Sequence, residues 1–165
     1  MRSQGQTQQT PSLYSRSLAP EGTGPGQLAR HGAGLKSLEA SVGRRLMGLA
    51  ILVTARQHDA QYQWTINEPV AIQAGLEPAV VDIVRHRRSV GDLAEPDAVV
   101  VEFGRELFDK HTVRPETYAR ALKAFGERDL VDLVGLMAQS SSEAALFAMF
   151  DQHLPESQKP LLPIP

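Results

Sequence analysis

Three prolines constrain the fold of this chain more than any other feature. Pro78, Pro96 and Pro115 each stand near the start of a run in which apolar residues recur every three or four positions. A proline is best tolerated in the first turn of a helix, because the N–H group that it lacks would have no intrahelical partner there. The runs that begin at these prolines predict helices over residues 78–87, 96–110 and 115–125.

The same spacing continues on both sides of these three helices. From Leu35 to Val53 the apolar residues again follow steps of three and four, and Gly43 can divide this stretch into two helices. The other predicted helices cover residues 59–74, which Gly75 can end, and residues 128–152, which follow Gly126. No segment alternates convincingly between apolar and polar residues as a half-buried strand does. The predicted fold class is therefore all-α.

The two ends of the chain differ from its middle. Residues 1–34 are rich in Gln, Gly and Pro and lack the apolar core of a secretory signal, so we expect a mostly disordered N-terminal tail. The last stretch, PESQKPLLPIP, cannot continue a helix because of its prolines. A chain of 165 residues suits one domain. We therefore expect a helical domain over residues 35–155 and a C-terminal tail over residues 156–165.

Charge and hydropathy exclude several classes of function. Lys and Arg number 17 against 19 Asp and Glu, so the net charge of -2 gives no general attraction for nucleic acid or anionic lipid. No apolar run reaches the roughly 18 residues of a membrane-spanning helix, and we expect a cytoplasmic protein with no membrane partner. The acidic residues Glu102, Glu106 and Asp109 share a helix face with basic neighbours, a pattern typical of a solvated surface.

Residues that hold metals or cofactors are scarce in this sequence. The chain has no cysteine, which excludes disulfides, thiolate nucleophiles and Cys-ligated metal centres. Its five histidines are scattered along the chain. Gly-rich phosphate loops and the common hydrolase motifs are also absent from the sequence. We predict no metal and no cofactor.

The stretch DAQYQWTINEP, residues 59–69, carries the candidate site. Trp64, Asn67 and Glu68 lie at steps of three and four, so they share one stripe of a helix. In a structural interpretation, Trp64 anchors the core or a subunit interface, and Glu68 is solvated at its edge. In a functional interpretation, Glu68 and Asn67 point into a cleft that Trp64 walls. Burial against an indole disfavours the charged form of a carboxylate, which suits it to proton transfer near neutral pH.

A longer run around this stretch resembles a known family. The resemblance is to the carboxymuconolactone decarboxylase family, covers about residues 43–154, and is carried by the motifs RRLMGLAILVTARQHDAQYQWTINEPVAIQAGL, DIVRHRR, PETYARALKAFG and VDLVGLMAQ. That family shares its all-helical fold with the AhpD-type alkylhydroperoxidases, so the resemblance implies an AhpD-like helical bundle. It also implies a small-molecule substrate and a homo-oligomer, commonly a trimer or hexamer.

The reactive positions of the family are altered in this chain. The resemblance places Gly48 where the family usually has a glutamate, and Asn67 where it has a histidine. The Cys-x-x-Cys-x-x-x-His motif of the peroxidase branch would fall on Ala60, Gln63 and Asn67. A thiol peroxidase needs one thiolate to attack the peroxide and a second thiol to resolve the product, so a chain without cysteine cannot be one. The decarboxylase branch uses acid and base side chains, and Glu68 is the titratable group on the stripe that could replace them.

Three functions remain, from three different classes. The first is a lyase- or isomerase-type enzyme that transfers a proton in a small carboxylic acid or lactone. Its predicted catalytic residues are Glu68, which moves the proton, and Asn67, which orients the substrate. Its predicted substrate-binding residues are Arg56, which pairs with a carboxylate, Tyr62, which orients the substrate, and Trp64, which walls the pocket. The second function is a non-catalytic homo-oligomer that binds a small molecule or serves as a scaffold. The third is a thiol-independent hydroperoxidase.

Overall fold

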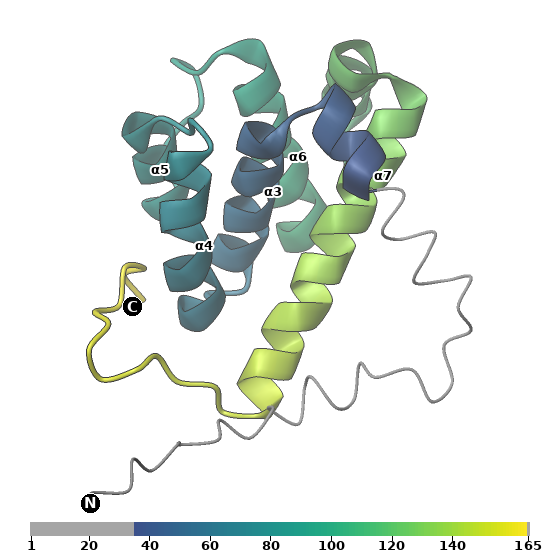
Figure 1. Cartoon of the computed structure of the whole chain (residues 1–165). Coiled ribbons are helices and arrows are strands. Elements are labelled where there is room, and N and C mark those ends of the chain that lie inside the picture. The colour runs from purple at the N-terminus through teal and green to yellow at the C-terminus, as the bar shows by residue number, and fades with distance from the viewer. Residues whose placement is uncertain (1–34, 165) are drawn as a thin grey trace, which may run out of the picture.

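The computed structural model describes residues 35–164, and this part of the chain is a bundle of α-helices without a strand (Figure 1). A short helix over residues 35–41 comes first. The helices that follow it are α3 (Arg44–Gln57), α4 (Gln61–Gln73), α5 (Pro78–Arg85), α6 (Glu95–Asp109) and α7 (Pro115–Met149). The all-α prediction is confirmed, whereas the predicted N-terminal tail, residues 1–34, lies outside the described residues. Within residues 35–164, no helix combines the length and the apolar character that crossing a bilayer requires.

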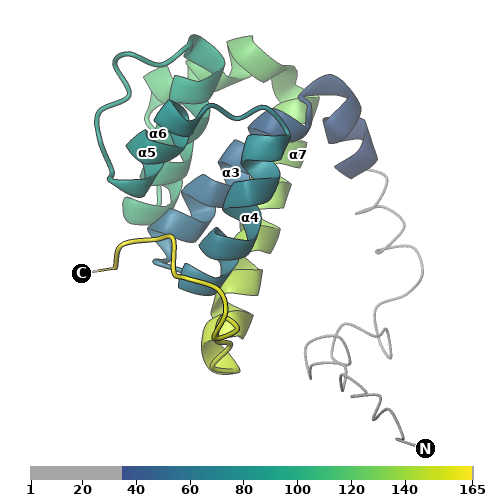
Figure 2. The same cartoon turned by 60° about the vertical axis from the view of Figure 1, so that its left-hand side comes forward.

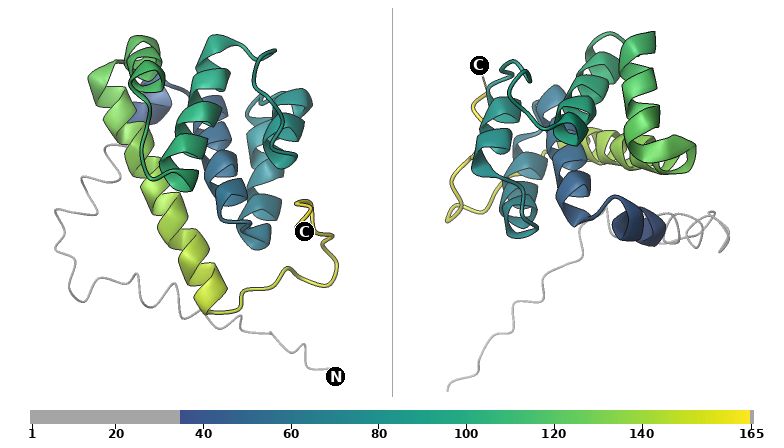
Figure 3. Two further views of the ribbon diagram at one scale, coloured as in Figure 1. Left: turned by 180° about the vertical axis from the view of Figure 1, so that it is seen from behind. Right: turned by 90° about the horizontal axis from the view of Figure 1, so that it is seen from above.

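Helix α3 lies at the centre of the bundle. It packs against α4, α5, α6 and α7, and the view from above in Figure 3 shows the other helices standing around it. Its residues Leu49, Leu52 and Ala55 are fully buried. A helix surrounded in this way buries apolar residues on several faces, because each neighbouring helix covers a different one.

A glycine permits the close contact between α3 and α6. A Cβ atom on Gly104 of α6 would lie 2.5 Å from Cγ1 of Val53 in α3, so a side chain at this position would overlap with the neighbouring helix. In the preceding turn of α6, Val99–Val101 are fully buried. These β-branched residues have only a moderate helix propensity, and their burial between α3 and α7 outweighs it.

The prolines begin helices as the sequence predicts. Pro78 and Pro115 are the first residues of α5 and α7, and Pro96 is the second residue of α6. Each occupies a position where the missing N–H costs no helical hydrogen bond. Pro69 lies inside α4, which nevertheless continues as a helix to Gln73.

Glycines end the helices or interrupt them. Gly75 has a φ of +96°, which residues with a side chain rarely adopt. Its N–H donates to the Ile72 carbonyl at 2.9 Å and the Leu76 N–H donates to the Ala71 carbonyl at 3.0 Å, the two bonds of a Schellman motif. Gly126, with φ +75° and ψ 168°, is non-helical, so α7 consists of two helical segments that meet where the sequence predicts a break.

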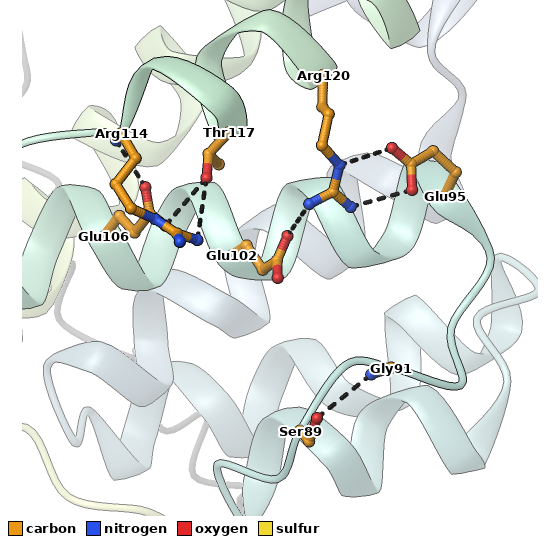
Figure 4. A network of polar contacts seen from close by, with 8 residues as sticks. All are labelled: Ser89, Gly91, Glu95, Glu102, Glu106, Arg114, Thr117 and Arg120. Atoms are coloured by element: carbon orange, nitrogen blue, oxygen red, sulfur yellow. Dashed lines mark hydrogen bonds and ion pairs between the residues drawn. The ribbon is translucent and has the colours of Figure 1, made fainter.

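A buried carboxylate joins α6 to the start of α7 (Figure 4). Glu106 is 5% exposed and accepts hydrogen bonds from the Arg114 backbone N–H at 2.8 Å, from Arg114 Nε at 2.6 Å and from Thr117 Oγ1 at 3.0 Å. Burial raises the pKa of Glu106, but these hydrogen bonds outweigh it, and the pKa lies below its ordinary value. The expectation that Glu106 belongs to a solvated face is wrong, because the chain after α6 folds Arg114 back over it.

The C-terminal segment returns to the bundle after α7. Residues 150–160 follow the helix in non-helical form, and Figure 2 shows the end of the chain running past α4. Leu162, within the predicted tail, is 4% exposed and belongs to the hydrophobic core. The tail therefore contributes to packing, although its prolines prevent it from forming a helix.

Candidate functional site

Trp64 lies in the core of the bundle, and the N–H group of its indole ring donates a hydrogen bond. The side chain is fully buried, and Nε1–H donates to Oε2 of Glu68, one turn later in α4, at 2.5 Å. A buried indole N–H needs an acceptor, and residues i and i+4 of a helix are neighbours. The spacing of these two residues in the sequence thus has a structural reason.

Glu68 is held by a second partner from another helix. Its Oε1 accepts a hydrogen bond from Nη2 of Arg85, at the end of α5, and the two groups form an ion pair. The Arg85 guanidinium also lies over the Trp64 ring, 5.8 Å from the ring centroid. We call these three residues the Trp64–Glu68–Arg85 cluster. Glu68 as a residue is only 7% exposed, so it is held out of water as the functional interpretation requires, but both carboxylate oxygens have protein partners.

A hollow of about 420 Å³ opens between α3 and α4, and we call it the α3–α4 hollow. Gly48 and Asn67, the positions at which the resemblance implies a glutamate and a histidine, both line it. Asn67 Nδ2 donates to the Gln63 carbonyl of its own helix at 2.7 Å, which leaves the amide oxygen able to accept from a ligand. Arg44 also lines the hollow, and its Nε donates to Glu39 at 2.6 Å in an exposed ion pair.

The α3–α4 hollow offers binding groups without an acid or base. Its lining, within the described part of the chain, includes neither a carboxylate nor an imidazole. A guanidinium such as that of Arg44 serves as a hydrogen-bond donor and not as a base, and the amide of Asn67 cannot exchange a proton at neutral pH. The lining residues can thus bind a polar or anionic small molecule, but they cannot act as general acid or general base.

Gly48 allows α3 and α4 to lie close together. A Cβ atom at position 48 would be 2.9 Å from the Ala71 Cβ and 3.2 Å from its Cα. Contacts below 3.0 Å force a neighbour to move, and here the neighbour is part of a helix. A glutamate at this position would require the two helices to separate.

Arg56 and Tyr62 lie away from the α3–α4 hollow. Arg56 is 8% exposed, and its Nη1 donates to Asp59 Oδ1 at 2.8 Å and to the Pro163 carbonyl at 3.0 Å. Its Nε is buried and has no partner. The Tyr62 ring lies 4.9 Å from the Phe147 ring of α7, beside a smaller hollow of about 200 Å³.

His58 also lines this smaller hollow. Its Nε2 lies 2.8 Å from Ser141 Oγ, and its ring meets the edge of the Phe108 ring at a centroid distance of 5.3 Å. Burial disfavours the charged imidazolium and so lowers the pKa of His58 below its ordinary value. The contact between His58 and Ser141 joins the end of α3 to the C-terminal part of α7.

The five predicted site residues therefore occupy four places. Trp64 and Glu68 belong to the buried cluster with Arg85. Asn67 lines the α3–α4 hollow, and Tyr62 lines the smaller one. Arg56 lies beneath the C-terminal segment, and Glu68 lines neither hollow.

Two residues of this region could not be recognised from the sequence. Arg85 stands in the basic cluster that ends α5, and such clusters commonly cap helices in solvent. Gln63 is 1% exposed; its Nε2 donates to the Ser140 carbonyl at 2.9 Å and to Ser140 Oγ at 3.0 Å, and its Oε1 has no partner. The apolar residues before Arg85 indicate that its helix packs against the rest of the bundle, whereas no sequence pattern indicates that Gln63 is buried.

Acidic residues and histidines do not gather into a metal site in the described part of the chain, where no group of three is close enough to hold an ion. Comparison with models of known protein families, with curated proteins and with solved structures gave no match. The function of this protein must therefore be inferred from its own residues.

Proposed function

We propose that this protein is a divergent carboxymuconolactone decarboxylase-like protein that binds a small carboxylic acid or lactone in the α3–α4 hollow without turning it over. The observation that carries this proposal is the lining of the hollow. It includes both altered positions, Gly48 and Asn67, and it lacks an acid or base. Binding can survive the replacement of the family's glutamate and histidine, whereas proton transfer there cannot.

The size and polarity of the hollow suit such a ligand. A volume of about 420 Å³ falls within the range of roughly 300–1,000 Å³ that small-molecule sites occupy. Arg44 supplies a positive charge, and its pair with Glu39 is exposed and so contributes little stability. A ligand carboxylate can replace Glu39 at low cost, while Asn67 accepts from or donates to a ring oxygen or hydroxyl.

Calorimetric titration with a panel of aromatic acids and lactones tests this proposal. We expect saturable binding, with no product detected by mass spectrometry after long incubation. Asn67→Ala should weaken binding at least about tenfold, because one polar contact to a ligand is worth about 1.4 kcal/mol. Gln139→Ala, on α7 and outside the hollow, is the control. Turnover of any member of the panel would contradict the proposal. Equal ligand affinity of the Asn67→Ala and Gln139→Ala variants would contradict it as well.

A second candidate function is the proton-transfer lyase or isomerase, in which Glu68 moves the proton. The observation in its favour is the burial of Glu68 against the Trp64 indole. This function requires Arg85 to leave the carboxylate when substrate enters. On a substrate that is turned over, Glu68→Gln should then abolish activity, and an unchanged kcat would refute this candidate. The roles of Arg56 and Tyr62 in such an enzyme stay predictions.

We also propose that the helices adopt the AhpD-like arrangement and that the protein associates with further copies of itself. Val70 of α4 lines the α3–α4 hollow and is 61% exposed, so a subunit contact at the hollow would cover it. Light scattering after size-exclusion chromatography should give the mass of a trimer or hexamer. A monomer would leave the hollow open.

A thiol-independent hydroperoxidase remains testable by a peroxide-consumption assay on metal-free protein, in which we expect no consumption.

A further inference from the structure

Ser141 of α7 forms a hydrogen bond to another helix instead of its own. A serine or threonine inside a helix commonly donates to the carbonyl four residues earlier, as Ser41 and Thr54 do at 3.0 and 2.9 Å. The Ser141 Oγ atom lies 2.8 Å from Nε2 of His58, the residue that follows the last turn of α3. Within residues 35–164, no other hydrogen bond engages the Ser141 hydroxyl group.

His58 is placed where its imidazole can act as a base. Its ring meets the edge of the Phe108 ring of α6, and this contact restricts how the imidazole can turn. In the tautomer with the proton on Nδ1, Nε2 accepts the hydrogen bond from the Ser141 O–H group. Burial lowers the pKa of His58, which favours the neutral imidazole that a base requires. A hydroxyl and a base within about 2.6–3.2 Å of each other form the arrangement that activates a serine nucleophile.

A cavity adjoins this pair of side chains. His58 lines the smaller hollow of about 200 Å³, and so do Ala144 and Ala148 of α7. Ser141 precedes these alanines by three and seven residues, so the three residues share one face of the helix. Because Ser141 is also bonded to His58, its hydroxyl group lies at the edge of the hollow.

The size and lining of the smaller hollow restrict the ligand that it can hold. Its volume lies below the roughly 300–1,000 Å³ of sites for drug-sized ligands. The rings of Tyr62 and Phe147 give its wall an apolar part. The smaller hollow therefore suits a short acyl chain or a single aromatic ring.

The carboxylate next to His58 in the chain is bound elsewhere. Asp59 Oδ1 accepts from Nη1 of Arg56 at 2.8 Å and from Nη2 of Arg87 at 3.3 Å. In a serine–histidine–aspartate triad, the carboxylate orients the imidazole and stabilises its protonated form. Without that support from Asp59, the reaction requires a leaving group that departs readily. Aryl esters and thioesters have such a leaving group, whereas free acids and alkyl lactones do not.

We propose that Ser141 and His58 form a nucleophile–base pair that hydrolyses small activated esters, namely aryl esters or thioesters. Ser141 Oγ attacks the carbonyl carbon while His58 Nε2 takes the hydroxyl proton. The bond from that carbon to the leaving oxygen or sulfur breaks, and the leaving group takes the proton from His58. Water then attacks the acyl-serine and gives a proton to His58. The bond from the acyl carbon to Oγ breaks, Oγ takes that proton, and a carboxylic acid is released.

Labelling the full chain with a fluorophosphonate, which bonds covalently to reactive serine hydroxyl groups, tests this proposal. We expect a single adduct, located on Ser141 by peptide mass spectrometry. Ser142, the next residue of the same helix, is exposed and is the internal control, which should stay unlabelled. The absence of an adduct, or equal labelling of the two serines, would overturn the proposal.

The release of p-nitrophenol from p-nitrophenyl acetate measures the reaction itself. Ser141→Ala and His58→Gln should each slow the release roughly 100-fold, the lower end of what a general base contributes. Ser142→Ala and His86→Gln are the matched controls and should keep the unaltered rate, because the His86 imidazole pairs with Asp82 instead. Equal rates in Ser141→Ala and Ser142→Ala would refute the assignment of the nucleophile.

This activity is independent of ligand binding in the α3–α4 hollow. Neither Ser141 nor His58 lines that hollow, so Ser141→Ala should leave ligand binding there unchanged. Circular dichroism should show the same helical signal in Ser141→Ala and in the unaltered protein. Labelling of the unaltered protein decides the question even if a variant unfolds.

Discussion

The indole N–H of Trp64 and the carboxylate of Glu68 are joined by a hydrogen bond of 2.5 Å within one helix, and Arg85 from the next helix takes the other carboxylate oxygen. A tryptophan and an acid that are candidates for chemistry in the sequence are thereby bound to each other, and to an arginine that the sequence did not indicate. A buried charge is tolerated when it is paired and hydrogen-bonded, and this cluster meets both conditions.

Breaking this pair should destabilise the protein strongly. Glu68→Ala leaves the Trp64 N–H without an acceptor and the largely buried Arg85 charge without a partner. We expect a loss of about 3 kcal/mol in the free energy of unfolding, measured by urea denaturation. Adding Arg85→Met should recover part of that loss, because it removes the unpaired charge. A loss below about 0.5 kcal/mol in Glu68→Ala would show that the pair is not held in solution.

Filling the contact between α3 and α4 should also destabilise the protein. Gly48→Ala places a methyl group 2.9 Å from the Ala71 Cβ, and we expect a loss of about 1–3 kcal/mol in stability. Gly135→Ala on α7 is the control, since no atom lies within 4 Å of its added Cβ; it should gain about 0.5–1 kcal/mol. If thermal denaturation gave both variants the same shift in Tm, the close approach of the two helices would be disproved.

Glu106 should make stability fall in acid. Its pKa is lower in the folded protein than in the unfolded chain, so the unfolded chain takes up the proton first. Its contribution is complete above the ordinary glutamate pKa of about 4.3 and is lost as pH falls from there through the folded pKa. Glu106→Gln should flatten the dependence of stability on pH below about pH 4.5, as measured by urea midpoints. An unchanged slope would contradict the buried position of this carboxylate.

His58 should make the stability of the protein depend on pH over a higher range than Glu106 does. Because burial lowers its pKa in the folded protein, the unfolded chain binds the proton more readily. Stability should therefore decline as pH falls below about 6.5 and level off below the folded pKa. NMR titration of the imidazole would measure that pKa directly, and His58→Gln should remove this part of the decline. A titration at or above the ordinary value would be the opposite result.

The helices and their ends were predictable because their causes are local. A proline without an N–H at position 78 and a glycine able to adopt φ +96° at position 75 act on their own backbones, whatever lies nearby. The candidate site was predictable only in part. One helical stripe relates Trp64 to Glu68, but no pattern within a helix identifies a partner on another helix, so Arg85 was missed.

The sequence alone determined that this chain is helical, where its helices break, and that it cannot use a thiol, since each follows from residue type and spacing. The tertiary structure decided which polar groups face one another. It turned Glu68 toward Arg85 instead of a cavity, buried Glu106 beneath Arg114, and brought Leu162 back to α4. Such pairings join residues far apart in the chain, and they form because packing of the apolar faces brings the helices that carry these residues side by side, whereas a single polar contact contributes little net stability.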